Sequence, residues 1–189
     1  LVRRLQRENC EILKVSRKEL DLSRQYETER WMAAARPEVI FVAAAKVGGI
    51  AANAAHPADF LYTNTLISMN IMKTAADLGV EKLLWMGSSC IYPKFAVQPI
   101  KENALLTGPL EPTNEAYAIA KIAALKLSQF YASQYGLNCV SVMPTNIYGQ
   151  NDNFDPQSSH VIPAMIRRMH EAKINGQNRI LLWGTGSPL

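Results

Sequence analysis

The sequence has few cysteines and no paired cysteine motif. Its 189 residues include three cysteines, Cys10, Cys90 and Cys139, and no two of them form a Cys-x-x-Cys pair. An odd, scattered set argues against a disulfide framework and against a zinc site. We therefore expect no bound metal and a reducing compartment, with the cytoplasm as the default location.

Long apolar runs and a strong excess of one charge are also lacking. No apolar stretch approaches the roughly 20 residues that span a bilayer, and no signal peptide pattern opens the sequence. The formal net charge is only +4, and the basic residues are scattered apart from pairs such as Arg3-Arg4. We expect neither membrane nor nucleic acid as a partner. A bound anionic cofactor or substrate would account for part of the positive excess.

A glycine-rich phosphate-binding turn is missing as well. Neither G-x-x-G-x-x-G nor G-x-G-x-x-G occurs, although a dinucleotide fold normally begins with a strand and such a turn. The sequence opens at Leu1 inside a helical pattern and stops at Leu189, so we expect both ends to be cuts in a longer protein. The missing first strand is central in the usual strand order, so we expect this polypeptide alone to be poorly stable and to bind dinucleotide weakly.

The sequence does contain a regular alternation of helical and strand patterns. Helices are predicted over 1–8, 22–35, 57–78, 114–135 and 161–175, and strands over 10–16, 39–45, 82–86, 137–143 and 180–183. This order predicts an α/β fold, a doubly wound parallel sheet of the Rossmann type with helices on both faces. It would lack its first strand and most of a small C-terminal domain. We assign 1–150 to the dinucleotide-binding domain and 151–189 to the start of a substrate-binding region.

Tyr117 and Lys121 lie four residues apart in the helix predicted over 114–135 and therefore on one helical face. A lysine ammonium near a phenol lowers the phenol pKa from about 10, which would make Tyr117 a usable proton donor and acceptor. Alone, the pair is far more often a chance feature of a helix surface than a catalytic one. Ser88, however, directly follows the strand 82–86, at the edge of a parallel sheet where ligands bind. A serine there, followed by a Y-x-x-x-K helix, resembles the catalytic set of short-chain dehydrogenases/reductases.

Longer blocks resemble the GDP-L-fucose synthase family of extended short-chain dehydrogenases/reductases, from one end of the chain to the other. They are AAAKVGGI (43–50), HPADF (56–60), GSSCIYPK (87–94), EPTNEAYAIAK (111–121), MPTNIYG (143–149), DNF (152–154), SSHVIPAMIRR (158–168) and WGTGSPL (183–189). The resemblance implies an NADPH-dependent enzyme. Such an enzyme epimerises GDP-4-keto-6-deoxy-D-mannose at C3 and C5, and then reduces the C4 ketone to give GDP-L-fucose.

The resemblance also implies catalytic roles. Ser88 and Tyr117 would hold the ketone oxygen, Cys90 would be the base and His160 the acid in the epimerisation, and Lys121 would bind the nicotinamide ribose. Cys90 lies two positions after Ser88, so in an extended segment both side chains face the same way. Taken alone, Cys90 is more often a small buried hydrophobic residue and His160 more often structural. Their sequence contexts favour catalysis.

Cofactor and substrate contacts can be assigned in the same way. Arg17 follows the strand predicted over 10–16 and could bind a 2′-phosphate, which favours NADP over NAD; an ordinary loop charge is the alternative. By resemblance, the cofactor also meets Asp21, Leu22, Ala43, Ala44, Ala45, Ser88, Tyr117, Lys121, Pro144, Asn146 and His160. The GDP-sugar would meet Ser88, Asn146, Arg168 and Trp183, with Arg167 able to exchange roles with Arg168.

Two alternatives remain open. Another extended sugar-nucleotide epimerase or dehydratase would share the Y-x-x-x-K pair but would lack the pairing of Cys90 with His160 in these contexts. A truncated, non-catalytic remnant that binds a partner is of a different class. The resemblance also implies a homodimer through the helices 57–78 and 114–135, although burial against a sheet explains their apolar composition equally well.

Overall fold

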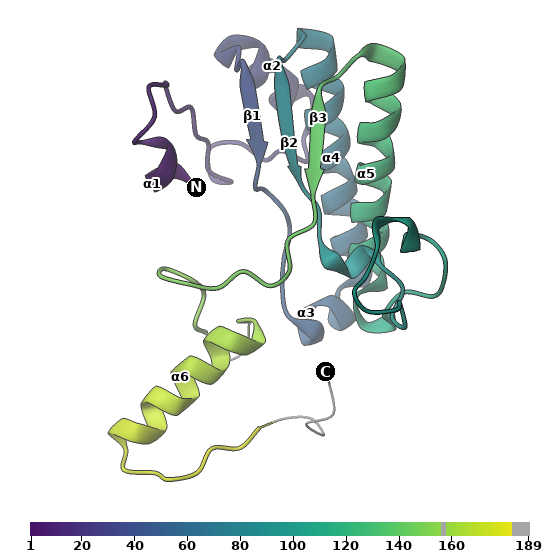
Figure 1. Ribbon diagram of the computed structural model, residues 1–189. Coiled ribbons are helices and arrows are strands. Elements are labelled where there is room, and N and C mark those ends of the chain that lie inside the picture. Colours follow the sequence, from purple (N-terminus) through teal and green to yellow (C-terminus); the bar gives the residue numbers. More distant parts are fainter. Residues whose placement is uncertain (156–157, 183–189) are drawn as a thin grey trace.

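A three-stranded parallel sheet forms the centre of the computed structural model, which describes residues 1–155 and 158–182 (Figure 1). The strands β1 (Val39–Val42), β2 (Lys82–Met86) and β3 (Cys139–Val142) lie side by side in chain order. The predicted α/β fold with a parallel sheet is confirmed, as are the centres of these three strands. Parallel strands bring their carboxyl ends to one edge of the sheet, and the loops that follow them meet there.

Two long helices cover one face of this sheet (Figure 1). They are α4 (Pro57–Leu78), which connects β1 to β2, and α5 (Glu115–Tyr135), which connects β2 to β3; α2 (Gln25–Ala35) packs against α4. Both connections are right-handed crossovers that advance in the same direction along the sheet, so both helices fall on the same side. In the part of the chain that the structure describes, the expected cover of both faces is therefore present on one face only.

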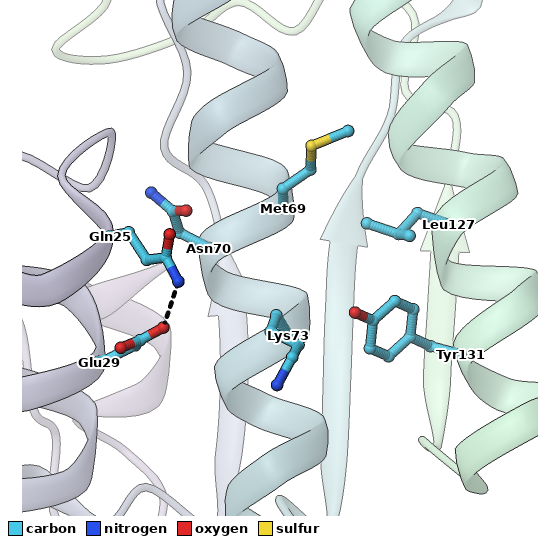
Figure 2. Close-up of a pocket in the computed structure, with 7 residues that line it drawn as sticks. All are labelled: Gln25, Glu29, Met69, Asn70, Lys73, Leu127 and Tyr131. Carbon is cyan, nitrogen blue, oxygen red and sulfur yellow. Dashed lines mark hydrogen bonds between the residues drawn. The ribbon is translucent and has the colours of Figure 1, made fainter.

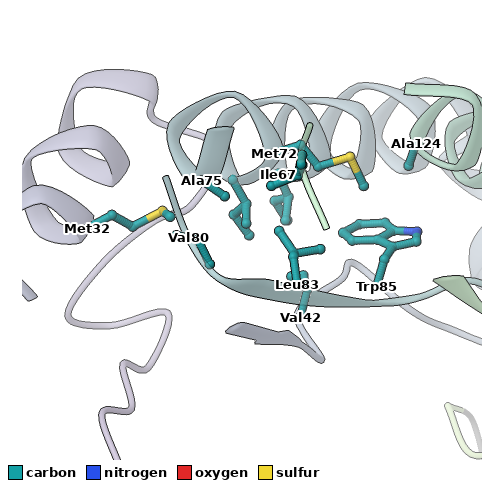
Figure 3. Close-up of a cluster of buried hydrophobic side chains, with 11 residues drawn as sticks. Met32, Val42, Ile67, Met72, Ala75, Val80, Leu83, Trp85 and Ala124 are labelled. Carbon is teal, nitrogen blue, oxygen red and sulfur yellow. The ribbon is translucent and has the colours of Figure 1, made fainter. Parts of the chain in front are cut away.

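The hydrophobic core lies between the sheet and these helices (Figure 3). Leu83 and Trp85 alternate along β2 toward the helices, where Met72 of α4 and Ala124 of α5 meet them. The core comprises Met32, Val42, Ile67, Ile71, Met72, Ala75, Val80, Leu83, Trp85, Ala124 and Leu137. Because α4 and α5 both contribute to it, the core holds both helices against the sheet.

Shorter elements gather near the carboxyl edge of the sheet or lie apart from it (Figure 1). The helix α3 (Ile50–Ala55) follows the Gly48-Gly49 turn and packs against the 3-10 turn η3 (Pro112–Asn114). Two further 3-10 turns are η1 (Ser89–Ile91) and η2 (Glu102–Ala104). The helix α6 (Val161–Ile174) lies beyond the carboxyl edge, away from the sheet.

Two predicted strands and parts of two predicted helices are not formed, and the helix expected over 22–35 begins at Gln25. Residues 10–16 and 180–182 have no strand structure, and the helix expected over 1–8 is limited to α1 (Val2–Leu5). The segment 10–16 lies away from β1 (Figure 1), so its backbone groups have no neighbouring ladder to join, and a strand needs one. Trp183 lies outside the described residues.

Candidate active site

The loop after β2 brings Ser88 and Cys90 into a single turn. Ser88 precedes η1, and its hydroxyl oxygen accepts a hydrogen bond from the Cys90 N–H at 3.3 Å. The Gly87 N–H donates to the carbonyl of Val142 at 2.8 Å, which joins the ends of β2 and β3. A Cβ on Gly87 would lie 2.3 Å from the sulfur of Met143 and 3.0 Å from the carbonyl oxygen of Val142, so this close approach favours glycine.

Lys121 is buried under the same loop. Its Nζ donates to the carbonyl of Met86 at 2.8 Å and lies 4.5 Å from the ring centroid of Trp85. The centroid of the Tyr117 ring is 5.7 Å away, so both members of the predicted pair do lie on one face of α5. Burial lowers the pKa of Lys121 to about 8, because removing an ammonium from water disfavours its charged form.

The pKa of Tyr117 departs from the sequence expectation. It is raised to about 12, first by burial and then by the negative charge of Cys90, while a hydrogen bond with Ser88 opposes the rise. The predicted lowering by Lys121 is therefore wrong, because burial disfavours the charged form of the phenol and is the largest cause of the shift. The same interactions place Ser88, Cys90 and Tyr117 next to one another.

Asn114 is a member of this cluster that the sequence analysis missed. Its Nδ2 lies 3.2 Å from the sulfur of Cys90, to which it donates a hydrogen bond. Asn114 precedes the first residue of α5, yet its side chain makes no capping hydrogen bond. The sequence signal was ambiguous, because an asparagine at a helix start ordinarily indicates a cap.

His160 stands apart from the other four expected catalytic residues. It is exposed and precedes the first residue of α6. The carbonyl of its neighbour Ser159 comes within 3.8 Å of the position that a Cβ on Gly49 would take. Gly49 precedes α3, which packs against η3, the turn that contains Asn114. The structure thus gathers Ser88, Cys90, Tyr117 and Lys121, and places His160 in a segment that reaches the same edge of the sheet.

The expected cofactor residues after β1 are held by a side chain of α4. The Lys46 N–H donates to Oδ1 of Asn64 at 2.8 Å, and Nδ2 of Asn64 donates back to the Lys46 carbonyl at 3.0 Å. This second missed residue fixes the end of the run Ala43, Ala44 and Ala45, whose side chains are exposed or half-buried. Methyl side chains there leave the backbone accessible to a flat ligand.

The segment with the other expected cofactor residues is anchored beside α2 and α4. Arg17 is exposed. The pKa of Asp21 is lowered, mainly by hydrogen bonds from the Ser23 hydroxyl and N–H and to a smaller extent by Arg17. The carbonyl of Leu22 accepts a hydrogen bond from Nδ2 of Asn70 on α4 at 2.9 Å.

The loop after β3 contains the expected residues Pro144 and Asn146, and the helix α6 contains Arg167 and Arg168. The carbonyl of Pro144 accepts a hydrogen bond from the Ser89 N–H at 3.3 Å, and Asn146 is exposed. On α6, Arg167 forms an ion pair with Glu171 at 2.7 Å, and Nη1 of Arg168 donates to the carbonyl of Leu181 at 3.3 Å. The loop after β3 is thus tied to the Ser88 turn.

A separate hollow between α2, α4 and α5 contains none of the expected site residues (Figure 2). A hydrogen bond of 2.8 Å from Gln25 to Glu29 borders it. It lies among the helices rather than at the carboxyl edge of the sheet. Its lining residues are Gln25, Glu29, Met69, Asn70, Lys73, Leu127 and Tyr131.

Two searches within the described ranges 1–155 and 158–182 bear on other kinds of site. No helix there is long and apolar enough to cross a bilayer. In the same ranges, no three or more His, Cys, Asp or Glu side chains are grouped so that they could hold a metal ion.

Comparison with known proteins identifies the family. The family model for the NAD dependent epimerase/dehydratase family matches residues 1–189. GDP-L-fucose synthase of Sinorhizobium fredii is 55% identical over 188 residues, which are 100% of this chain and 60% of the relative. GDP-L-fucose synthase 1 of Arabidopsis thaliana is 54% identical over 190 residues, 100% of this chain and 59% of the relative.

A solved structure gives the same result for the fold. The GDP-D-glycero-L-gluco-heptose synthase from Campylobacter jejuni, determined in the presence of NADPH, superposes with a TM-score of 0.85 at 37% identity. The match covers 92% of this chain and 52% of that one. The chain spans about 60% of the length of the curated relatives named above. On the full-length family match and these relatives, the chain belongs to the NAD dependent epimerase/dehydratase family.

Proposed function

We propose that the protein containing this chain is an NADPH-dependent epimerase-reductase that converts GDP-4-keto-6-deoxy-D-mannose into GDP-L-fucose. The observation that carries the proposal is the cluster of Ser88, Cys90 and Tyr117, in which the Tyr117 phenol interacts with both the Cys90 sulfur and the Ser88 hydroxyl. Relatives named GDP-L-fucose synthase, at 55% and 54% identity, support this choice of substrate.

The chemistry requires stabilisation of one oxygen in both stages. The hydrogens on C3 and C5 both flank the C4 ketone, so removal of either produces an enolate with its charge on the C4 oxygen. Donors aimed at a developing oxyanion lower the barrier by several kcal/mol. In our proposal Ser88 and Tyr117 supply these donors. With its pKa raised to about 12, Tyr117 keeps its proton throughout the neutral range.

Inversion at each carbon requires a base on one face and an acid on the other. We assign the base to Cys90 and the acid to His160. The thiol shares a turn with Ser88, and the imidazole precedes α6 in the segment whose backbone approaches Gly49. Closer approach of His160 to the other groups would be part of substrate binding.

The residues present fit a nicotinamide dinucleotide. Ala43, Ala44 and Ala45 follow β1 without bulky side chains, and Arg17 is exposed and suited to a 2′-phosphate. When bound, the cofactor supplies the hydride for C4. Tyr117 would then deliver its proton to the C4 oxygen. Lys121 would bind the ribose, with Asp21, Leu22, Pro144, Asn146 and His160 as further contacts.

The remaining assignments rest on the same resemblance. The GDP-sugar would contact Ser88, Asn146, Arg168 and Trp183, within a division into a dinucleotide domain (1–150) and the start of a substrate region (151–189). We place the protein in the cytoplasm as a homodimer that pairs through α4 and α5. Met69 and Ile119 on these helices are 44% and 42% exposed, which leaves apolar surface for such a contact.

Incubation of the complete protein with GDP-4-keto-6-deoxy-D-mannose and NADPH in deuterated water tests the activity. We expect oxidation of NADPH and deuterium at both C3 and C5 of the product. Oxidation without deuterium would leave a reductase that does not epimerise and would overturn the assignment of Cys90 and His160. Turnover without net NADPH oxidation would instead indicate another sugar-nucleotide epimerase or a dehydratase, and no turnover would indicate a non-catalytic protein.

A further inference from the structure

We propose that Asn114 is a positioning residue that holds Cys90 and stabilises its thiolate. The proposal deepens the function proposed above, because it concerns the thiol to which we assign proton abstraction. The Asn114 amide at the start of α5 donates to the sulfur, while the Cys90 N–H donates to the Ser88 hydroxyl and holds the turn that carries the thiol. The first contact would orient the sulfur and favour its ionised form, and the second would fix the backbone beneath it.

The contact between the two side chains is direct. Nδ2 of Asn114 donates a hydrogen bond to Sγ of Cys90 over 3.2 Å, and the residues are 24 positions apart in the chain. The interaction is therefore created by the fold, where η1 packs against α5. Because an amide N–H only donates, it favours a sulfur that has lost its proton, and hydrogen bonds to an ionised acceptor are roughly twice as strong as neutral ones.

The other half of the Asn114 amide supports a role beyond local structure. Its Oδ1 is buried and has no hydrogen-bond partner among the described residues. Its side chain also does not cap α5, although it stands at the capping position. Leaving a buried acceptor unpaired costs free energy. The orientation of Asn114 therefore leaves one buried acceptor unpaired and donates to a sulfur instead of capping the helix. We take contact with Cys90, and not helix capping, as the reason for this orientation.

The surroundings of Cys90 make this donor important. Tyr117 faces it from α5, and the negative charge on Cys90 raises the pKa of this phenol. At η3, Glu111 forms an ion pair with Lys94 at 2.8 Å, so these opposite charges largely offset each other near the thiol. Glu115, the first residue of α5, adds a negative charge close to Asn114. The helix start, the Lys121 ammonium behind Tyr117 and the Asn114 amide remain as the groups that favour the thiolate, and of these only the amide contacts the sulfur.

The pH dependence of Cys90 alkylation tests the proposal without any substrate. The complete protein would be treated with iodoacetamide from pH 5 to 10, and modification of Cys90 would be followed by peptide mass spectrometry, which separates it from Cys10 and Cys139. Asn114→Asp keeps the shape of the side chain but places a carboxylate at the sulfur. We expect its inflection to move upward by at least one pH unit, which slows alkylation at pH 7 about tenfold because the thiolate fraction falls by that factor.

Asn114→Ala and Thr113→Val complete the set. Asn114→Ala removes the donor and should shift the inflection in the same direction by a smaller amount, which keeps the test valid if the Asp variant does not fold. Thr113 is the neighbour in η3, and its hydroxyl donates to Glu111 at 3.3 Å, so its variant should keep the wild-type inflection. Equal inflections in wild type, Asn114→Ala and Asn114→Asp would overturn the proposal.

Deuterium incorporation separates this proposal from the function on which it rests. In Asn114→Asp we expect the pH profile of exchange at C3 and C5 to shift upward together with alkylation. If Cys90→Ala keeps full exchange, the base assignment fails, while the alkylation series still decides whether Asn114 stabilises the thiolate.

Discussion

Lys121 shows how burial acts on a single charged side chain. The ammonium is almost fully removed from water, donates to the Met86 carbonyl and lies over the Trp85 ring. These contacts do not balance the lost hydration, since the pKa of Lys121 falls to about 8. The lysine is therefore held near its point of ionisation, while Tyr117 beside it is held protonated.

Replacement of Lys121 by methionine should change how stability depends on pH. Between about pH 8 and 10.5 the unfolded chain keeps a proton that the folded chain has lost, so this group makes folding more favourable as pH rises. The free energy of unfolding of wild type, compared with that of Lys121→Met, should therefore rise by up to about 3 kcal/mol as the pH increases across this window. Urea unfolding at several pH values measures the difference, and a constant difference would contradict the lowered pKa.

Replacement of Tyr117 by phenylalanine tests the proton donor. Loss of the hydroxyl should lower kcat for NADPH oxidation by about 10²- to 10⁴-fold, the usual contribution of a positioned acid. The fold should persist, since the ring keeps its edge-to-face contact with Phe60 at 6.5 Å. Tyr135→Phe, an exposed tyrosine on the same helix, is the control and should keep wild-type activity. Steady-state kinetics and circular dichroism provide the two measurements.

Replacement of Gly87 by alanine tests the junction between β2 and β3. The added methyl would lie 2.3 Å from Sδ of Met143 and 3.0 Å from the carbonyl of Val142. The methionine can move, but the backbone carbonyl can do so only by lengthening the hydrogen bond from Gly87. We expect a loss of about 1–3 kcal/mol in the free energy of unfolding, typical of an overpacked core. Thermal unfolding of Gly87→Ala and Gly87→Ala/Met143→Ala would show how much of the loss the side chain causes.

At the scale of elements, the sequence predicted best where local signals and tertiary packing agree. The helix 57–78 was predicted with the observed bounds, because Pro57 suits a first helical position and Gly79 adopts the left-handed conformation at the end, with φ 67°. The strand 82–86 was also predicted with its observed bounds. By contrast, 10–16 has the composition of a strand but no partner beside it, and composition alone does not supply a ladder.

The residues of the candidate site likewise fall into those that local sequence patterns predict and those that only tertiary packing reveals. Ser88, Tyr117 and Lys121 follow from a strand end and a helical spacing, which are local patterns. Asn114 and Asn64 act through contacts with residues 24 and 18 positions away. No spacing rule predicts such contacts, because the packing of α5 and α4 on the sheet creates them.

The exposed side of α4 and α5 leads to a prediction about assembly. If these helices pair two copies, Met69→Lys/Ile119→Lys should weaken the dimer, since each change places an ammonium in an apolar contact. Analytical ultracentrifugation of the complete protein should then show a shift toward monomer. Val97→Lys, at an 85% exposed position in a loop, is the control and should stay dimeric. A double variant that sediments like wild type would place the interface elsewhere.

For the molecule as a whole, the uncovered face of the sheet is the main feature. Val39, Phe41 and Val140 alternate with core residues and are 47%, 40% and 41% exposed on the side opposite α4 and α5. Parallel sheets are ordinarily covered on both faces, and an apolar patch of this kind invites association. The 189 residues alone therefore leave apolar surface in contact with water.

This surface should be detectable when residues 1–189 are produced alone. We expect enhanced ANS fluorescence and concentration-dependent self-association, measured by fluorescence titration and light scattering. Phe41→Thr/Val140→Thr should reduce both signals, since threonine keeps the strand propensity while lowering the apolar area. Val97→Thr, a change of an exposed loop residue outside the sheet and outside α4 and α5, serves as the control. An ANS signal that is unchanged by the sheet-face variant would assign the dye to another surface.

The two hydrogen bonds between the Asn64 amide and the backbone N–H and carbonyl of Lys46 have a mechanical consequence. These two hydrogen bonds join α4 to the segment that follows β1, so α4 cannot shift along its axis or rotate without moving that segment. A displacement of α4 would therefore be passed, through this one amide group, to the adjoining run Ala43, Ala44 and Ala45.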